Sequence, residues 1–545
     1  MKDRYLYIVD IRFRQEAINL LEYINIRQDF KILSLSPYSS FLLESLNLDY
    51  ITYHNAISKE DFFKKLFREY KKIENSLLDM SNIDLMFAFR EIATIKSFEL
   101  YLYFLFQFLE SKKKSYKLIY IGDTPNLPTQ SYLNSATYFY NRELFEKIFF
   151  IDNRDKRFYL KNRLKIRFLS LFRKNFFKKL YFRFLKRIEL NYDNIHFFDI
   201  YSRVESVKIE SKIEKKDISK LIEYINGLEE RAESSYIKSR YLNLKKDLSS
   251  FLLQKVFSIK FHPFTFLANY TNYRDALLYK RNGAQRLFMQ HGNYMQENIF
   301  LKYNEIYPAT INFVFNDFTK DMFLKRGAKE VYSVGSINFN YKIKSPKRYK
   351  YDFVYIAYCT SYGYSGFGVF SKTTNFSIDA DDIYRRHKSV IELFGRKLKD
   401  KRLVIKLQYG IVNGAMSYIP LLELSREYKN IKIEFIKPLS KLFSEARYII
   451  SDYLSSEFIN RELHYKRDIL LFKNSLGLDS AILSDIEKLY ILVDNIDDLE
   501  RKILNIQNIS ALKSRDKSLI EYYSSKDIDT KSVVWNILNS KLNLQ

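Results

Sequence analysis

Residues 284–298 read AQRLFMQHGNYMQEN, and this stretch determines how the rest of the chain is interpreted. Its apolar run, 287–289, ends abruptly in Gln290, His291 and Gly292. The pattern is typical of a buried parallel strand that carries polar side chains to the carboxyl edge of a sheet, where open α/β folds bind ligands. Gly292 has no Cβ, so the backbone can turn sharply or approach a ligand there. Taken alone, the stretch is better explained as an ordinary strand end with a surface histidine than as a ligand-binding edge. Other segments of the chain decide between these two interpretations.

The first 150 residues alternate short apolar runs with helical patterns. The runs 5–10 (YLYIVD), 30–35 (FKILSL) and 118–123 (LIYIGD) are typical of buried strands. This rhythm predicts a parallel, doubly wound sheet. The first strand-to-helix turn contains no glycine, so the dinucleotide-binding fingerprint is absent. Asp123 ends the third run and is a candidate substrate contact, although a cap or turn at a strand end explains it equally well.

A second alternating series starts at residue 351 with the run YDFVYIAY. We therefore predict an α/β fold with two Rossmann-like domains that face a central cleft, the first of which contains helical insertions. The first domain is residues 1–340, on the acceptor side, with a basic helical insertion at about 153–260. Residues 341–350 form the linker, and residues 351–545 form the nucleotide-donor domain with terminal helices that can cross back.

Length and composition restrict the class of protein. A chain of 545 residues is too long for one core, and 47% hydrophobic residues exclude global disorder. The single cysteine, Cys359, excludes a disulfide framework and any zinc site built from cysteines. The N-terminal sequence fits neither a signal peptide nor a membrane span, and no transmembrane helix is expected. A cytoplasmic location is the default prediction.

The formal net charge of +26 predicts an affinity for polyanions. Residues 153–188 concentrate this charge, because Lys and Arg alternate there with Phe, Leu and Tyr, and Asp155 is the one acidic residue. Such a segment suits the surface of an anionic membrane. Nucleic acid could bind the same residues, but no nucleic-acid module accompanies them, and a solvated helical face is a further alternative. We predict a protein peripheral to the inner face of the plasma membrane, with nucleic acid not expected as a partner.

The segment 433–472 contains a second polar strand end, SDYLSSEF, which starts at Ser451. Small hydroxyl residues at the start of a helix offer side-chain donors together with free backbone N–H groups and the positive end of the helix dipole. This arrangement forms an anion site suited to a nucleotide diphosphate. Asp452 or Ser455 as a simple helix cap is the alternative, and for either residue alone it is the better one.

The His-Gly turn, a lysine-containing middle strand and the stretch PLSKLFSEARYIISDYLSSEF…KRDILLF together resemble bacterial surface-polysaccharide transferases of the GT-B fold. The pattern is most similar to CDP-glycerol glycerophosphotransferases and capsule-type glycosyltransferases, and it covers residues 284–472. In these families the His-Gly turn faces the cleft from the acceptor side, and the serine-rich helix start holds the phosphates of the donor.

The resemblance implies a role for each candidate residue. His291 would be the general base, or a ligand to the leaving phosphate, because an imidazole titrates near neutrality. Gln290, Gly292 and Asn293 would orient the substrate. Asp123 lies outside the resembling stretch and is a substrate-orienting candidate from its position at a strand end. The donor-binding residues would be Lys406, Ser451, Asp452, Ser455, Ser456 and Glu457. The families carry a His-Pro pair after the middle strand, whereas this chain has Lys406-Leu407-Gln408, which leaves the type of donor open.

The resemblance implies a glycosyltransferase of surface-polysaccharide biosynthesis (capsule, O-antigen or a similar glycan) that acts on a glycan or lipid-linked acceptor. The donor would be a nucleotide-activated sugar, consumed as a substrate, with no cofactor and no metal. The acids at 379, 381 and 382 are better explained as the opening of a helix than as metal ligands. A polyol-phosphate transferase of the CDP-glycerol type is the first alternative. A non-catalytic protein that binds membrane or nucleic acid is the second.

Overall fold

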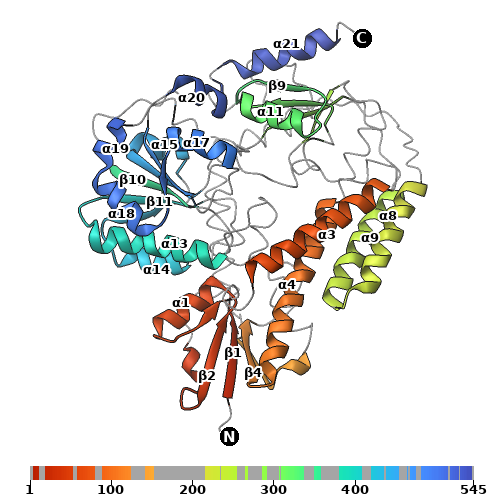
Figure 1. Cartoon of the computed structure of the whole chain (residues 1–545), viewed down its shortest axis with the longest axis vertical. Coiled ribbons are helices and arrows are strands. Elements are labelled where there is room, and N and C mark those ends of the chain that lie inside the picture. The colour runs from red at the N-terminus through yellow and green to blue at the C-terminus, as the bar shows by residue number, and fades with distance from the viewer. Residues whose placement is uncertain are drawn as a thin grey trace, which may run out of the picture.

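The structure is a computed structural model, and Figure 1 shows the whole chain. It describes residues 4–11, 19–52, 58–79, 89–123, 142–151, 215–233, 235–253, 264–267, 285–290, 306, 309–336, 349–357, 380–407, 419–434, 437–452, 463, 467–473, 480–512, 516–526 and 528–542. Their strands form three sheets, and every strand pair in these sheets is parallel.

The first sheet has the strand order β3-β2-β1-β4-β5. Its strands are β1 (Arg4–Asp10), β2 (Asp29–Ser34), β3 (Ile51–Thr52), β4 (Lys117–Asp123) and β5 (Lys147–Ile151). The order reverses between β1 and β4, as in a Rossmann half, so the ligand crevice of such a sheet lies at the carboxyl ends of these two strands.

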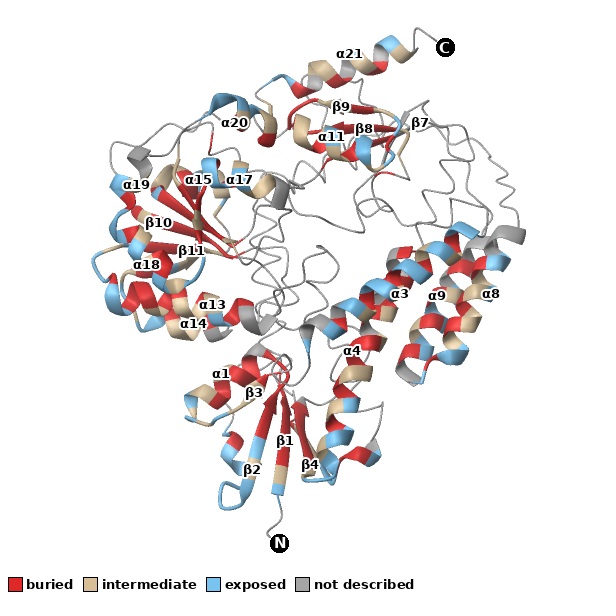
Figure 2. Cartoon of the chain, in the orientation of Figure 1, coloured by how far each residue is buried: buried red, intermediate tan, exposed pale blue. Residues whose placement is uncertain are grey.

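Helices cover both faces of the first sheet. One face packs on η1 (Leu20–Glu22) and α1 (Pro37–Ser45). The other face shares one core with α3 (Lys59–Asp79), α4 (Phe89–Lys113), η3 (Arg142–Leu144), α8 (Lys215–Arg231) and α9 (Ser235–Leu253). Figure 2 shows the buried residues of these strands and helices facing one another. The paired helices α8 and α9 agree with the helical character predicted for this part of the insertion.

The second sheet has the order β6-β7-β8-β9. Its strands are β6 (Phe264–Leu267), β7 (Gln285–Met289), β8 (Ile311–Val314) and β9 (Val331–Ser333). α11 (Asp317–Lys325) covers one face; Asn316 is its N-cap and accepts a hydrogen bond from the Thr319 N–H. The other face packs against the C-terminal helix α21 (Thr530–Leu542).

The third sheet has the order β12-β11-β10-β13-β14-β15. Its strands are β10 (Tyr351–Ile356), β11 (Leu403–Lys406), β12 (Ile431–Glu434), β13 (Ala446–Ser451), β14 (Ile469–Phe472) and β15 (Ile491–Val493). Numbered from its first strand, this order is 3-2-1-4-5-6, which is that of a six-stranded Rossmann sheet with its switch point between β10 and β13.

Two layers of helices sandwich the third sheet. One layer is α13 (Ala380–Glu392) with its continuation η8 (Leu393–Lys397), α14 (Ile419–Arg426), α18 (Ile496–Leu504) and α19 (Ile506–Leu512). The opposite layer is α15 (Leu439–Glu445), α17 (Ser480–Leu489) and α20 (Lys517–Tyr523). None of the described helices is long and apolar enough to cross a membrane.

These sheets confirm the α/β class and the two Rossmann-like sheets predicted from the sequence. The described strands of residues 1–340 lie in two separate sheets, a division that the strand pattern alone did not indicate. The domain boundaries stay a prediction, since most of the linker 341–350 lies outside the described residues.

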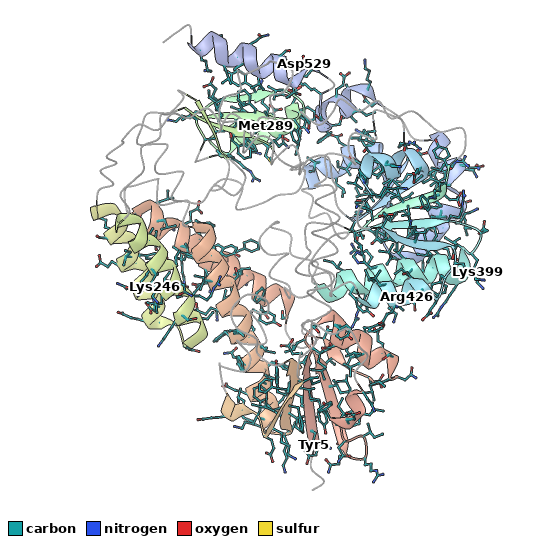
Figure 3. All side chains as sticks on the ribbon, turned by 180° about the vertical axis from the view of Figure 1, so that it is seen from behind. Tyr5, Lys246, Met289, Lys399, Arg426 and Asp529 are labelled. Carbon is teal, nitrogen blue, oxygen red and sulfur yellow. The ribbon has the colours of Figure 1, made fainter. Side chains whose placement is uncertain are left out.

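The C-terminal part of the chain returns to the second sheet, as expected for terminal helices that cross back. The Asn316 Nδ2 donates to the Tyr523 carbonyl over 2.9 Å, and the Lys526 N–H donates to the Phe315 carbonyl over 3.1 Å. In Figure 3, Met289 of β7 and Asp529, which precedes α21, lie on the elements that meet here. Residues beyond the third sheet therefore complete the core of the second.

Gly335 marks the point of closest approach. It has a φ of +72°, and a Cβ at this position would lie 2.6 Å from the Lys526 carbonyl oxygen. Gly327, which follows α11, has a φ of +94° but no atom within 4 Å of such a Cβ. The two glycines share the left-handed backbone and differ in the space around it.

We predict that Gly335→Ala lowers the free energy of unfolding by about 3 kcal/mol and Gly327→Ala by about 1 kcal/mol. Both variants strain the backbone, and Gly335→Ala must also push away the returning chain. Urea unfolding of the full chain measures the two values. Equal losses would show that the approach of Lys526 does not require a glycine.

Candidate functional site

The carboxyl ends of β10 and β13 bring a cluster of polar side chains to the switch point of the third sheet. Asp452 directly follows β13, and its N–H donates to the Ile356 carbonyl over 3.3 Å, so the parallel ladder continues by one residue. Its side chain is 0% exposed. A carboxylate removed from water requires partners that compensate its charge.

Three side chains surround the Asp452 carboxylate. The Tyr355 hydroxyl, from β10, lies 2.7 Å from both carboxylate oxygens. His387 Nε2, from α13, lies 3.0 Å from Oδ2, and this imidazole is also 0% exposed. Arg386 Nη1, from the same helix, lies 3.5 Å from Oδ1. We call Asp452, Tyr355, His387 and Arg386 the switch-point cluster.

The switch-point cluster keeps Asp452 ionised. Burial alone would raise the pKa of this carboxyl group, but the hydrogen bond with His387, the charge of Arg386 and the hydrogen bond from Tyr355 outweigh it and hold the pKa below its ordinary value. An ionised carboxylate only accepts hydrogen bonds, so we assign the ring proton that faces it to His387 Nε2.

Arg386 connects the cluster to the next strand. Its guanidinium carbon lies 5.0 Å from the ring centroid of Phe472, the last residue of β14. Its Nη1 is buried and has no hydrogen-bond partner among the described residues. The guanidinium group therefore lies at the carboxyl ends of β13 and β14.

Ser451 and Lys406 belong to the opposite face of the same edge. Lys406 pairs with Ile356, and Ile356 pairs with Ser451, so the three residues form one row across β11, β10 and β13. Ser451 is 0% exposed, and strand alternation directs it toward the layer of α15 and α17, away from α13. Adjacent candidates Ser451 and Asp452 thus serve different faces of the sheet.

Gln290 directly follows the end of β7, as the sequence predicts, and its side chain forms contacts within the protein. Its Oε1 accepts the Phe315 N–H over 2.5 Å, and its Nε2 lies 3.5 Å from Thr319 Oγ1, with the residue 2% exposed. The amide group therefore links the carboxyl ends of β7 and β8 to α11. Its role in orienting a substrate stays a prediction.

Asp123 ends β4 at the carboxyl edge of the first sheet, in the position expected for a ligand-contacting loop. A second carboxylate lies on the neighbouring strand, where Asp10 ends β1, is 0% exposed and accepts a hydrogen bond from the Tyr120 hydroxyl over 3.2 Å. A Cβ at Gly122 would lie 2.5 Å from that hydroxyl oxygen, so the glycine makes room for the phenol. Both Rossmann-like sheets therefore carry a buried tyrosine–aspartate pair at the switch point.

The remaining candidates lie outside the described residues. These are His291, Gly292, Asn293, Ser455, Ser456 and Glu457, together with the basic stretch 153–188. The expectation that His291 and Ser455 face each other across a groove stays a prediction. Among the described residues, no three His, Cys, Asp or Glu side chains are grouped so that they could hold a metal ion.

Tyr355, His387 and Arg386 were not among the site residues predicted from the sequence. A signal for His387 was present in the helix 380–392, ADDIYRRHKSVIE, where Ile383, His387 and Val390 fall on one stripe at helical spacing. A histidine on an apolar stripe is buried and needs a polar partner. Nothing in the local sequence identifies that partner as Asp452.

α13 also contacts the first sheet. Lys388 Nζ lies 2.6 Å from Glu44 Oε2 of α1, and the Tyr384 hydroxyl lies 3.3 Å from the same oxygen. The Glu44 Oε1 accepts a hydrogen bond from the Tyr50 hydroxyl over 2.8 Å. In Figure 1, α1 lies next to α13 and α14. The helix that carries His387 is therefore held from two sides.

Comparisons with known proteins give no matching family model and no matching curated protein. Among solved structures, the chain is similar to S. aureus MnaA with UDP (10% identity, 75% of this chain, 92% of that one, TM-score 0.35). It is also similar to the Methanocaldococcus jannaschii UDP-GlcNAc 2-epimerase with UDP-GlcNAc and UDP (12% identity, 98% and 99% covered, TM-score 0.33). A third is the lipopolysaccharide outer core galactosyltransferase WaaB (12% identity, 78% and 99% covered, TM-score 0.31). The α/β class of this chain rests on its own sheet topology.

We predict that Asp452→Asn lowers the free energy of unfolding by about 3 kcal/mol at neutral pH, because Arg386 loses its buried counter-charge and the hydrogen bonds from His387 and Tyr355 lose a charged acceptor. The folded pKa of Asp452 is lowered, so its stabilisation is complete above the ordinary carboxyl pKa of about 3.9 and is lost as the pH falls through the folded value. The difference between wild type and variant should therefore shrink below about pH 4.

Urea unfolding measures this difference. It is carried out between pH 3 and pH 7, a range that includes the ordinary Asp pKa of about 3.9. Asp400→Asn is the matched control, because Asp400 is exposed and paired with Lys401 at the surface. It should leave the stability unchanged. A difference for Asp452→Asn that stays constant with pH would mean that the carboxyl group is already protonated in the folded protein.

Proposed function

We propose that the protein is a glycosyltransferase of surface-polysaccharide biosynthesis that uses a nucleotide-activated sugar. The switch-point cluster is the observation that carries the proposal. It places a buried, compensated carboxylate at the ligand edge of a six-stranded Rossmann-order sheet. The serine-rich stretch 453–457, which the resemblance assigns to donor phosphates, follows Asp452 directly in the chain.

The donor side lies on the third sheet. Ser455 and Ser456 bind the diphosphate together with backbone N–H groups, and Glu457 binds a ribose hydroxyl. The contacts of the Asp452 carboxylate fix the point at which the chain leaves β13. Lys406 adds positive charge at the same edge of the sheet.

The acceptor side lies on the second sheet. His291 follows Gln290, whose side chain anchors the end of β7 to Phe315. His291 takes the proton from the acceptor hydroxyl, whose oxygen then forms a bond to the anomeric carbon of the donor sugar. The bond from that carbon to the donor phosphate breaks, and the nucleotide diphosphate leaves with the electron pair. Donors near Ser455 stabilise the charge that develops on it.

The acceptor is a glycan or a lipid-linked glycan at the inner face of the plasma membrane. The basic stretch 153–188 would hold the enzyme at that anionic surface. A polyol-phosphate transfer from a CDP-linked donor is the second candidate, because the sequence pattern is also similar to that of CDP-glycerol transferases.

We predict that His291→Ala lowers the rate of transfer by roughly 100-fold or more, since the acceptor hydroxyl loses its general base. Nucleotide binding should not change, because the donor site lies on the other sheet. A radiolabelled-sugar assay and calorimetry measure the two quantities. His54→Ala is the control, since it also removes a histidine and lies two residues after the edge strand β3. It should leave the rate of transfer unchanged. Normal transfer by His291→Ala would favour a non-catalytic protein that binds membrane or nucleic acid.

The donor type can be identified by thermal unfolding with UDP-, CDP-, GDP- and CMP-linked compounds. A ligand that binds only the folded state stabilises it and therefore raises the unfolding temperature. At a ligand concentration one hundred times the dissociation constant, the free energy of unfolding rises by about 2.7 kcal/mol. We expect one nucleotide-linked sugar to give the largest shift, and Ser455→Ala with Ser456→Ala to remove it. A shift with CDP-glycerol alone would favour polyol-phosphate transfer.

A further inference from the structure

One donor atom of Arg386, Nη1, has no hydrogen-bond acceptor in the part of the chain that the structure describes. This nitrogen is buried, and Asp452 Oδ1 lies 3.5 Å away. The hydrogen bonds to that carboxylate come instead from Tyr355 and His387. A guanidinium group has five N–H donors, and a buried donor without an acceptor is unfavourable.

The position of Arg386 is that of a ligand-binding group. The guanidinium stacks over Phe472, the last residue of β14, and faces Asp452, which follows β13. Both neighbours mark the carboxyl edge next to the switch point, where Rossmann sheets bind ligands. The side chain is 13% exposed, so it is not completely removed from solvent.

The guanidinium group is also fixed before any ligand arrives. The cation–π contact with Phe472 and the charge of Asp452 both restrain its position. A planar guanidinium binds phosphate oxygens in pairs, and a restrained group loses little entropy when it does so. The hydroxyls of Ser455 and Ser456 are neutral, whereas a diphosphate carries more than one negative charge, so the site also needs a cation.

We propose that Arg386 binds a phosphate group of the nucleotide diphosphate, with Asp452 and Phe472 as the residues that position it. The inference rests on the proposed function, since it names a residue for the donor of that reaction. It assigns Asp452 an indirect role: the carboxylate holds Arg386 and does not touch the donor.

Inorganic pyrophosphate is the first probe, followed by UDP, CDP and GDP, each titrated by calorimetry into the full chain at physiological salt. Arg386→Met keeps the contact with Phe472 but removes the donors, and it should weaken pyrophosphate and the bound nucleotide at least tenfold. Arg386→Lys keeps the positive charge but lacks the paired N–H donors of the planar guanidinium group, so it should retain part of the affinity. Arg426→Met, on the exposed end of α14 (Figure 3), should stay within twofold of the wild type.

The proposal is overturned by an Arg386→Met variant whose pyrophosphate affinity stays within twofold, or by a wild type that binds neither pyrophosphate nor any nucleoside diphosphate. Circular dichroism checks folding, and Arg386→Lys supplies the test should Arg386→Met not fold. In the transfer reaction, the KM for the donor should rise at least tenfold with kcat little changed, which a purely structural residue would not produce.

Failure of the inference is distinguishable from failure of the proposed function. Loss of pyrophosphate binding in Arg386→Met, with no sugar transfer by the wild type from any donor, would support the phosphate site and remove the transferase. Transfer by the wild type with the same donor KM in Arg386→Met would support the transferase and remove the role of Arg386.

Discussion

The third sheet depends on the compensation of one charge. The Asp452 carboxylate has no contact with solvent, and a buried ion without partners would be far more costly than the stability of a folded domain allows. Tyr355 and His387 supply the hydrogen bonds and Arg386 the counter-charge. Because these partners come from β10 and α13, the same contacts fix the end of β13, the start of the following loop and the rotation of α13 about its axis.

That helix also joins two parts of the molecule. One side of α13 turns His387 toward Asp452, while Tyr384 and Lys388 contact Glu44 of the first sheet's layer. A shift of α1 would therefore move a helix whose imidazole supports the switch point. The first sheet contains a similar pair, in which the Tyr120 hydroxyl of β4 donates a hydrogen bond to Asp10 of β1.

Local pattern was enough to predict β1, β2 and β4, a parallel sheet and the α/β class, because buried strands are short apolar runs separated by helical stretches. It did not indicate β5, β6 or β15. It was not enough for the site. His387 and Asp452 are 65 residues apart, Tyr355 and Asp452 are 97 apart, and no local rule relates them. Gln290 shows the converse. Its amide oxygen accepts the Phe315 N–H, a contact within the protein that the sequence did not indicate, and its role in orienting a substrate stays a prediction.

The return of the C-terminal helices has a consequence for biosynthesis. Asn316 contacts Tyr523 across 207 residues, and one face of the second sheet is covered by Val534 and Leu538. A nascent chain leaves the ribosome from its N-terminus, so Leu287 and Phe313 remain uncovered until the last helix has emerged. The second sheet is thus completed only after translation has passed the third, and its apolar face is the surface on which chaperones would act in the meantime.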